Sequence, residues 1–295
     1  MTQKGRGWFI AAFMAPATLI YGLLVVYPLL QSFAFSLFRW RGVSRKRTFL
    51  GLGNFTRLAG DDAFMKALHN NLVLLVVGGV ATIALSVALA HGLQGNGRVA
   101  RTLRGIILFP QIISLVVVAV LWMFLFNPDF GLLTSGMNAI GLGGWVHNWI
   151  GHQTTALGSV GVAFVWYAVG FYTMLFAAGI RALPAEVQEA AELDGAAGLR
   201  RFWNVTWPML WSVKRVAIVH FTIAVMNVFA LVFLMTRGGP DRATETLLTY
   251  LYESAFTHSE FGYATAIAVV NFIVVMALAG GIMFWFRRNP EGARA

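Results

Sequence analysis

The sequence predicts an all-α, polytopic membrane protein with six transmembrane helices. Of its 295 residues, 58% are hydrophobic and only 12% are charged, which is more apolar than a soluble domain of this length places in one core. The uncharged intervals are long enough for six crossings, because about 20 apolar residues span the hydrocarbon as a helix. The basic residues behind the net charge of +10 gather at the ends of these intervals, where lipid headgroups attract them. No nucleic-acid module is visible, so the charge does not indicate nucleic acid.

The apolar intervals set the expected elements. We expect spans near residues 9–30, 70–92, 105–126, 156–179, 214–236 and 264–286. The first run follows Lys4 and Arg6 and continues uncharged to Phe38, which is too long for the core of a signal peptide, so we expect a retained helix. The absence of cysteine excludes disulfides and thiolate metal sites.

Basic residues predict the orientation. With six spans, both termini share one side with the loops after spans two and four, and these segments hold 13 of the 22 Lys and Arg residues. The loop from Asn127 to Gln153 holds none, so the positive-inside rule places both termini in the cytoplasm. The segment from Arg39 to Arg47, with five basic residues, falls on the outer side. Either a partner's acidic surface overrides the rule there, or the number of spans differs.

An acidic island lies between spans four and five. It holds Glu186, Glu189, Glu192 and Asp194 within nine positions. Pro184 suits a first helical residue and Gly195 suits a left-handed helix end, so we expect a short helix from Ala185 to Asp194. Val187, Ala190 and Ala191 share one face of it, and the glutamates line a neighbouring face. A second short helix, Leu199 to Asn204, is expected before Pro208 leads into span five.

The island also carries a family motif. Glu189, Ala190 and Ala191, followed by Gly195, Val205, Trp207 and Pro208, resemble the EAA signature of binding-protein-dependent ABC importer permeases, with Val205 and Trp207 departing from the usual Ile and Leu. The segments YPLLQSFAFSLF, FLGLGNFTRL, LFNPDFGLL, TRGGPDRATETLLTYLYESAF and FGYATAIAVVNF are similar to those of maltose-type carbohydrate permeases.

This resemblance implies the fold of type I importer permeases: one transmembrane domain over residues 1–295, with core spans at about 70–286 and a cytoplasmic coupling loop at 184–208. In such permeases the loop seats in a cleft of a separate ATPase subunit. The implied coupling residues are Glu189, Ala190, Ala191, Asp194 and Gly195. Glu189 would face a basic residue of the ATPase, and the small residues would permit close approach.

The resemblance further implies several partners in a bacterial inner membrane. These are a second permease, expected to make a heterodimer, two ABC ATPases, an extracytoplasmic solute-binding protein and membrane lipid. The chain has no G-x-x-x-x-G-K-[ST] motif, and GGPDRAT lacks the lysine. ATP and magnesium are therefore expected on the partner ATPases, with no cofactor on this chain and no enzymatic activity of its own. No catalytic or metal-ligand spacing is present, and His69, His91 and His220 are assigned no chemistry.

Polar residues within the spans suggest the substrate. The centres of the spans lack Asp, Glu, Lys and Arg, each of which costs about 2.5–3.5 kcal/mol at mid-membrane depth, and this absence favours a neutral polar solute. Amides and aromatic faces suit a sugar. The candidates for the substrate path are Asn227, Trp166, Tyr167, Gly170, Tyr172 and Asn271. The alternative for the asparagines is bonding to neighbouring helices, and for Gly170 a packing notch.

Two other functions stay open at this point. An ABC permease for glycerol phosphate or another polar solute keeps the same architecture, and a stand-alone secondary carrier does not. The loop after span five is expected to form an amphipathic helix from Thr244 to Ala255. By the resemblance, this helix would close the path on the outside or meet the binding protein.

Overall fold

A computed structural model describes residues 3–95 and 97–287 of the chain. Within these residues the fold is mainly helical, as predicted, with one small two-stranded hairpin. Arg288 and Arg294, which count toward the predicted orientation, lie outside the described residues. The chain divides into two compact units, one of residues 1–61 with 251–272 and the other of residues 62–250 with 273–295. They are described separately.

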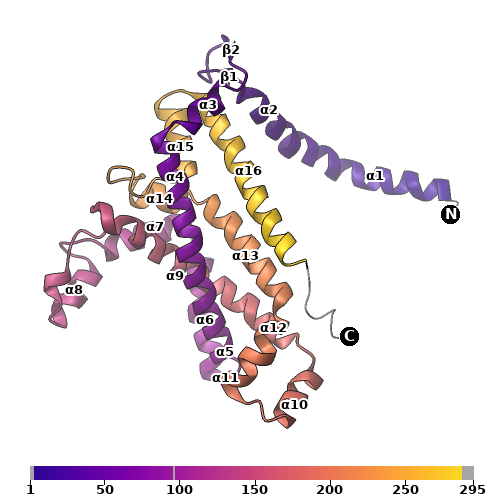
Figure 1. Ribbon diagram of the computed structural model, residues 1–295, viewed down its shortest axis with the longest axis vertical. Coiled ribbons are helices and arrows are strands. Elements are labelled where there is room, and N and C mark those ends of the chain that lie inside the picture. Colours follow the sequence, from indigo (N-terminus) through magenta and orange to yellow (C-terminus); the bar gives the residue numbers. More distant parts are fainter. Residues whose placement is uncertain (1–2, 96, 288–295) are drawn as a thin grey trace. The chain divides into compact units, whose positions relative to one another are not determined.

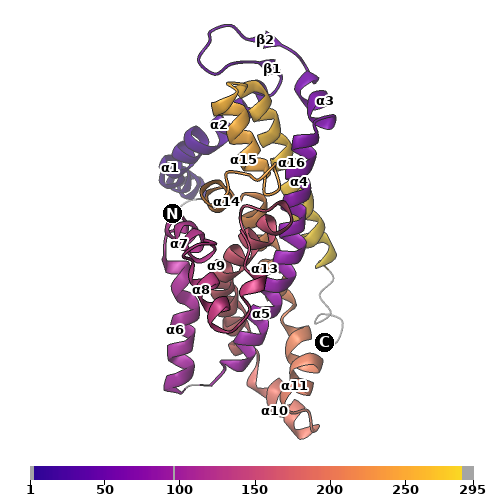
Figure 2. The same cartoon turned by 90° about the vertical axis from the view of Figure 1, so that its left-hand side faces the viewer.

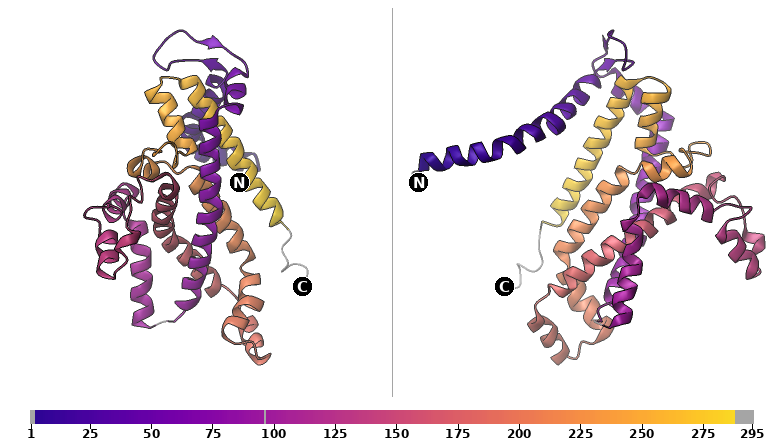
Figure 3. Two further views of the ribbon diagram at one scale, coloured as in Figure 1. Left: turned by 60° about the vertical axis from the view of Figure 1, so that its left-hand side comes forward. Right: turned by 180° about the vertical axis from the view of Figure 1, so that it is seen from behind.

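The smaller unit begins with a long apolar helical segment, which leads into a small hairpin (Figures 1 and 3). Its elements are α1 (Gln3–Tyr21), a π-helical turn (Gly22–Val26), α2 (Tyr27–Phe35), β1 (Phe38–Arg39), β2 (Thr48–Phe49), α3 (Gly53–Ala59), a second π-helical turn (Glu253–Thr257) and the start of α16 (Phe261–Trp285). The strands pair antiparallel, with Phe38 opposite Phe49. The buried Asn54 holds the hairpin to α3, because its amide donates to the carbonyls of Ser36 at 2.7 Å and Phe38 at 3.0 Å.

The larger unit contains the remaining helices. They are α4 (Asp62–Val73), a π-helical turn (Leu74–Gly78), α5 (Gly79–Gly92), α6 (Arg98–Ile112), α7 (Leu115–Leu125), α8 (Leu132–Ala139), a 3-10 turn (Gly143–Trp145), α9 (Gln153–Arg181), α10 (Ala185–Leu193), α11 (Gly198–Arg201), a π-helical turn (Phe202–Thr206), α12 (Trp207–Met209), α13 (Trp211–Met226), α14 (Ala230–Met235), α15 (Leu247–Tyr252) and the end of α16.

Helix α9 forms the core of the larger unit and packs against both α5 and α6 (Figure 2). Its 29 residues rise roughly 44 Å, more than the ~30 Å hydrocarbon core. Small residues permit the close approach to α5: Ala90 and Ala163 are fully buried, and the Ser86 hydroxyl donates to the Val169 carbonyl at 3.1 Å. Helices in lipid associate through such small residues and side-chain hydrogen bonds.

Among the described residues, four helices are continuous and apolar enough to cross a membrane: Trp8–Phe35, Asp62–Gly92, Gln153–Arg181 and Phe261–Trp285. Counting two bent pairs as single spans gives six. The predicted third span, 105–126, is one of them, and α6 and α7 meet at 102°. Two residues cause the bend. Pro110 provides no backbone N–H in the last turn of α6, and the Ser114 hydroxyl accepts the Val116 N–H at 3.4 Å to begin a new helix.

The predicted fifth span is wrong in its course. Helix α13 begins at Trp211, after a 72° bend from the preceding helical segment, and ends at Met226, so residues 227–229 interrupt the predicted interval 214–236. The fully buried Asn71 stabilises this break. Its amide nitrogen donates to the Val225 carbonyl at 2.9 Å, and its amide oxygen accepts the Leu247 N–H at 2.8 Å. The Val225 carbonyl also accepts the Val228 N–H at 3.1 Å, so Asn71 adds a second donor there and supplies the acceptor for the first N–H of α15.

The predicted helix from Thr244 to Ala255 is shorter in the structure. Helix α15 begins at Leu247, because the residues before it form a buried polar turn. The Thr249 hydroxyl donates to the Glu245 carboxylate at 2.5 Å, and the Thr244 hydroxyl lies 2.7 Å from that of Thr236. Glu245 is only 4% exposed, and Arg242 forms an ion pair with it at 3.3 Å.

Candidate functional site

The acidic island forms the short helix α10, as the sequence predicts. It spans Ala185–Leu193 and follows Pro184, whose ψ of 132° places it before the helix rather than in its first turn. Gly195 has φ +75°. The N–H of Ala196 reaches the Ala191 carbonyl at 2.9 Å, and that of Gly195 reaches the Glu192 carbonyl at 3.0 Å. This pair of bonds is a Schellman motif, which ends the helix sharply and turns the chain.

One face of α10 is exposed among the described residues. Ala191 is 7% exposed, whereas Glu186, Glu189 and Ala190 are exposed. Leu193 is 90% exposed, and no sequence pattern predicted a role for it. Exposed apolar and acidic side chains on one short helix suit a contact with another protein.

The remaining acidic residues differ in their contacts. Glu192 pairs with Arg201 of α11 and so joins the two short helices. For Glu189 and Asp194, no ion pair occurs among the described residues. Both carboxylates are exposed to solvent.

The second short helix is displaced from its predicted position. It spans Gly198–Arg201, and Phe202–Thr206 forms a π-helical turn instead of continuing to Asn204 as an α-helix. This turn directs aromatic side chains onto the bundle. The Phe202 ring lies 4.7 Å from that of His91 on α5, and the Trp207 ring lies 6.5 Å from that of Phe176 on α9.

A buried cation completes this aromatic cluster. Lys214 is 8% exposed, its Nζ donates to the Trp207 carbonyl at 2.8 Å, and the ammonium lies 4.4 Å from the centre of the Trp207 ring. The hydrogen bond and the cation–π contact compensate its burial. Phe202, Trp207 and Lys214 therefore join residues 202–207 to α5, α9 and α13.

A cavity of about 360 Å³ lies among α6, α7, α9 and α13. It opens beside the break in the fifth span, and Asn227, Val228 and Phe229 line it. The Asn227 amide donates to the Ile223 carbonyl at 2.8 Å at the end of α13. Because the helix stops here, the Asn227 side chain lies at the wall of a cavity rather than on a helix packed by its neighbours.

Three of the predicted path residues meet at this cavity, namely Asn227, Tyr167 and Tyr172. Gln111 and His220 also line it, and neither was predicted as a path residue. His220 was assigned no chemistry, and its Nδ1 lies 2.9 Å from the Tyr172 hydroxyl. The Gln111 Oε1 is buried and accepts no hydrogen bond from the described residues. A polar residue in an apolar run was the available signal for Gln111.

The other predicted path residues lie elsewhere. Trp166 packs edge-to-face on Trp122, with the ring centres 5.7 Å apart. At Gly170 a β carbon would collide with the carbonyl oxygen of Ile107 on α6, so this glycine is a packing notch between helices, the alternative stated above. Asn271 is buried in the smaller unit.

The described residues hold no group of three or more His, Cys, Asp or Glu side chains arranged for a metal ion. The lining of the cavity holds no Asp, Glu, Lys or Arg. Its chemistry is therefore neutral hydrogen bonding and contact with aromatic faces.

Comparison with known proteins identifies the family. Residues 71–290 match the family model described as the inner membrane component of binding-protein-dependent transport systems. The chain is 36% identical over 281 residues to a probable ABC transporter permease protein, YurN, of Bacillus subtilis, covering 95% of this chain and 96% of that one.

Other relatives and a solved structure agree. The diacetylchitobiose uptake system permease protein NgcF of Streptomyces coelicolor is 34% identical, covering 97% of this chain and 84% of that protein. The sn-glycerol-3-phosphate transport system permease protein UgpA of Brucella abortus is 30% identical, covering 93% and 92%. A chain of a bacterial ABC transporter that imports the acidic polysaccharide alginate has the same fold, with a TM-score of 0.84 at 19% identity and 97% of each chain covered.

The helical fold, the short helices α10 and α11 between α9 and α13, and these matches lead to one assignment. The family is the permease component of ABC importers, which has no ATPase site of its own, so the secondary-carrier alternative is set aside. The chain belongs to the family of binding-protein-dependent transport system inner membrane components and is a permease subunit of an ABC importer.

Proposed function

We propose that this permease carries a neutral sugar or oligosaccharide across the bacterial inner membrane. The observation behind this proposal is the chemistry of the cavity, whose lining offers amide, phenol and imidazole groups beside aromatic rings and no charged side chain. Sugars take directed hydrogen bonds from such groups and stack their C–H faces on rings. The name of the relative NgcF, a diacetylchitobiose uptake permease, agrees with this substrate class.

In this proposal Asn227 and Gln111 hydrogen-bond to the passing sugar, and Tyr167 and Tyr172 form the wall. The acceptor of Gln111 has no partner among the described residues, and a sugar hydroxyl is a suitable donor. Trp166 and Gly170 support the wall by packing. Asn271 remains a path candidate, and the variant Asn271→Ala tests it in the assay below.

The substrate is tested with the complete transporter in proteoliposomes, with ATP on the motor side and the cognate binding protein on the other. We expect uptake of a neutral sugar, and Asn227→Ala should lower uptake about five- to tenfold, since one hydrogen bond contributes about 1–1.5 kcal/mol. Asn138→Ala, in the outer helix α8, is the matched control. If the binding protein and the transporter accept no neutral sugar, this part of the proposal is rejected.

Glycerol phosphate is the second candidate, because the relatives named UgpA from Brucella are sn-glycerol-3-phosphate permeases. A phosphate in the cavity would meet no Lys or Arg in the lining, and charge at membrane depth is costly without a partner. The same proteoliposomes distinguish the two solutes. Uptake of glycerol phosphate without uptake of sugar would favour the second candidate.

We further propose that the whole chain acts as one transmembrane domain, 1–295, and that residues 184–208 form a cytoplasmic coupling loop. The domain pairs with a second, different permease and with two ATPases that bind ATP and magnesium. An extracytoplasmic binding protein delivers the solute. Closure of the ATPases would move α10, and through Phe202 and Trp207 the spans, so that the cavity opens outward.

Glu189 is the residue through which we expect α10 to engage an ATPase, together with Ala190, Ala191, Asp194 and Gly195. Glu189→Lys should abolish sugar uptake while ATP hydrolysis continues, because it places a cation against the basic residue expected on the partner. Glu186→Lys, with the same change of charge one turn earlier, is the control for a general effect on the helix. Uptake per ATP that is unchanged by Glu189→Lys, or reduced equally by both variants, would contradict the assignment.

A further inference from the structure

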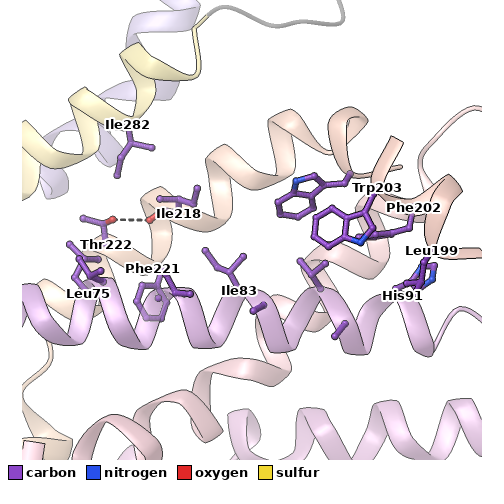
Figure 4. Close-up of a pocket in the computed structure, with 17 residues that line it drawn as sticks. Leu75, Ile83, His91, Leu199, Phe202, Trp203, Ile218, Phe221, Thr222 and Ile282 are labelled. Carbon is purple, nitrogen blue, oxygen red and sulfur yellow. Dashed lines mark hydrogen bonds between the residues drawn. The ribbon is translucent and has the colours of Figure 1, made fainter. Parts of the chain in front are cut away.

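His220 is a polar side chain within α13 that does not bond to its own helix. Thr222, on the same helix, donates to the Ile218 carbonyl at 2.8 Å (Figure 4), which is how a hydroxyl in an apolar helix commonly finds a partner. The Nδ1 of His220 instead lies 2.9 Å from the Tyr172 hydroxyl of α9. The two residues also line different spaces, since Thr222 lines the apolar pocket between α5 and α13 (Figure 4) and His220 lines the cavity beside Asn227.

The burial of Tyr172 decides which nitrogen of His220 carries the proton. Tyr172 is 2% exposed, and its hydroxyl bonds to His220 alone among the described residues. A buried O–H group that donates to nothing is costly, so the Tyr172 hydroxyl donates to Nδ1. An imidazole whose Nδ1 accepts a hydrogen bond is neutral and carries its proton on Nε2.

The imidazole ring is held on two sides, and its Nε2 is left open. The Phe171 ring lies against it, with the ring centres 4.9 Å apart and the planes inclined by 32°, while Tyr172 holds Nδ1. Within the described part of the chain Nε2 makes no hydrogen bond, and His220 is exposed. Phe171, Tyr172 and His220 all line the cavity, so a solute there can accept a hydrogen bond from Nε2.

This donor complements the acceptor that the cavity already offers. The Gln111 Oε1 accepts no hydrogen bond from the described residues, whereas the Nε2–H of His220 has nothing to donate to. A sugar hydroxyl both donates and accepts, so it suits a lining that contains one group of each kind. Because His220 is neutral in this tautomer, the lining stays free of charge.

We propose that His220 binds the solute through its Nε2–H and that Tyr172 positions it by fixing the tautomer. This proposal rests on the proposed function, because it requires a solute that brings hydrogen-bond acceptors into the cavity. His220 is then a binding residue, and Tyr172 is a positioning residue that acts through it.

The tautomer is measured without any solute. The complete transporter, with isotope-labelled histidine in this chain, is reconstituted in lipid and studied by solid-state nitrogen NMR, and the spectrum of His220→Gln identifies the signals of His220. We expect the proton on Nε2, and we expect the Nδ1 resonance to move when Tyr172→Phe removes its donor. A proton on Nδ1 in the wild-type protein would overturn the proposal, as would an Nδ1 resonance that Tyr172→Phe leaves in place.

Two substitutions at position 220 separate a contact with the solute from a contact with Tyr172. Glutamine places an amide N–H at the same remove from Cβ as Nε2, whereas asparagine places an amide oxygen at the same remove as Nδ1. The probes are the neutral sugars of the uptake assay above, beginning with diacetylchitobiose. We expect His220→Asn to lower uptake about five- to tenfold, the factor for one lost hydrogen bond, and His220→Gln to retain most of it. His69→Asn, at an exposed position of α4 outside the lining, is the matched control.

The opposite order of the two variants, with His220→Gln the weaker, would show that His220 only holds Tyr172. Wild-type uptake in His220→Asn would overturn the contact with the solute. If His220→Asn instead releases the second permease on purification, the Nε2–H belongs to that interface and the proposal fails. Tyr172→Phe is the second variant if His220→Asn does not fold, and it should also lower uptake. If the wild-type transporter carries no neutral sugar, the proposed function fails and the solute contact with it, whereas the NMR result still decides the tautomer.

Discussion

At position 170 a single hydrogen in place of a side chain decides how closely α6 and α9 approach. A β carbon there would collide with the Ile107 carbonyl oxygen, and backbone cannot rotate aside as a side chain does. Gly158 lies on the same helix, and a β carbon there would meet nothing within 4 Å. The two glycines therefore separate the effect of packing from that of helix propensity.

We expect Gly170→Ala to destabilise the protein by about 1–3 kcal/mol, the usual cost of overpacking a close helix contact. Gly158→Ala should be neutral or stabilising by up to about 1 kcal/mol, because alanine is the better helix former. Thermal unfolding of the two variants in detergent, with matched lipid content, measures the difference. Equal effects of the two substitutions would show that the contact between α6 and α9 contributes little.

The candidate residues show which roles are visible in sequence. Tyr167, Tyr172 and Asn227 were identified because a polar or aromatic group in the middle of an apolar run is visible in the sequence, and all three line the cavity. Trp166 has the same pattern, yet it packs on Trp122, because adjacent residues of a helix face different neighbours. The exposure of Leu193 had no comparable signal, since it depends on what the rest of the fold leaves uncovered.

Among the elements, the apolar intervals were predicted well and their bends were not. Hydropathy records how apolar a segment is, but it does not record where the helix in that segment bends. The bend between α6 and α7 depends on Ser114 acting as a cap. The break after Met226 is bridged by Asn71, which lies 154 residues away from the Val225 carbonyl to which it donates. Such long-range partners are not deducible from the local pattern, whereas the end of α10 at Gly195 was, because a left-handed glycine acts locally.

The contact between Phe202 and α5 gives a prediction at this scale. Phe202 is 4% exposed and contacts His91 of α5. We expect Phe202→Ala to reduce the solute transported per ATP hydrolysed by more than half while hydrolysis continues. The void that it leaves, costing about 3–5 kcal/mol in a packed core, would loosen the contact through which we propose that motion passes from α10 to the bundle.

The measurement compares uptake and phosphate release in the same proteoliposomes. Phe130→Ala removes a phenylalanine that is 64% exposed near the start of α8, and it should leave the ratio unchanged. If Phe202→Ala lowers uptake and hydrolysis in proportion, then Phe202 contributes to assembly or stability and does not transmit the motion.

For the whole molecule, orientation in the membrane is the property that the basic residues predict. The loop from Asn127 to Gln153 has no Lys or Arg, whereas the segments that join spans two to three and four to five are basic. The hairpin segment from Arg39 to Arg47 has five basic residues on the side predicted to be external. The five basic side chains are exposed. The Arg47 guanidinium lies 4.5 Å from the centre of the Trp40 ring, so this cation makes a cation–π contact within the hairpin segment itself.

The absence of cysteine from the chain makes this orientation directly measurable. A single cysteine at Val43, 95% exposed in the basic hairpin, should react with a membrane-impermeant maleimide added outside intact spheroplasts. A cysteine at Leu193, 90% exposed in α10, should react only after the membrane is opened. The cysteine-free parent gives the background. Because an odd number of crossings separates the two positions in a six-span chain, labelling of both from the same side would require a different number of spans. Labelling of both from outside would also remove α10 from the cytoplasmic face, where we propose that an ATPase docks.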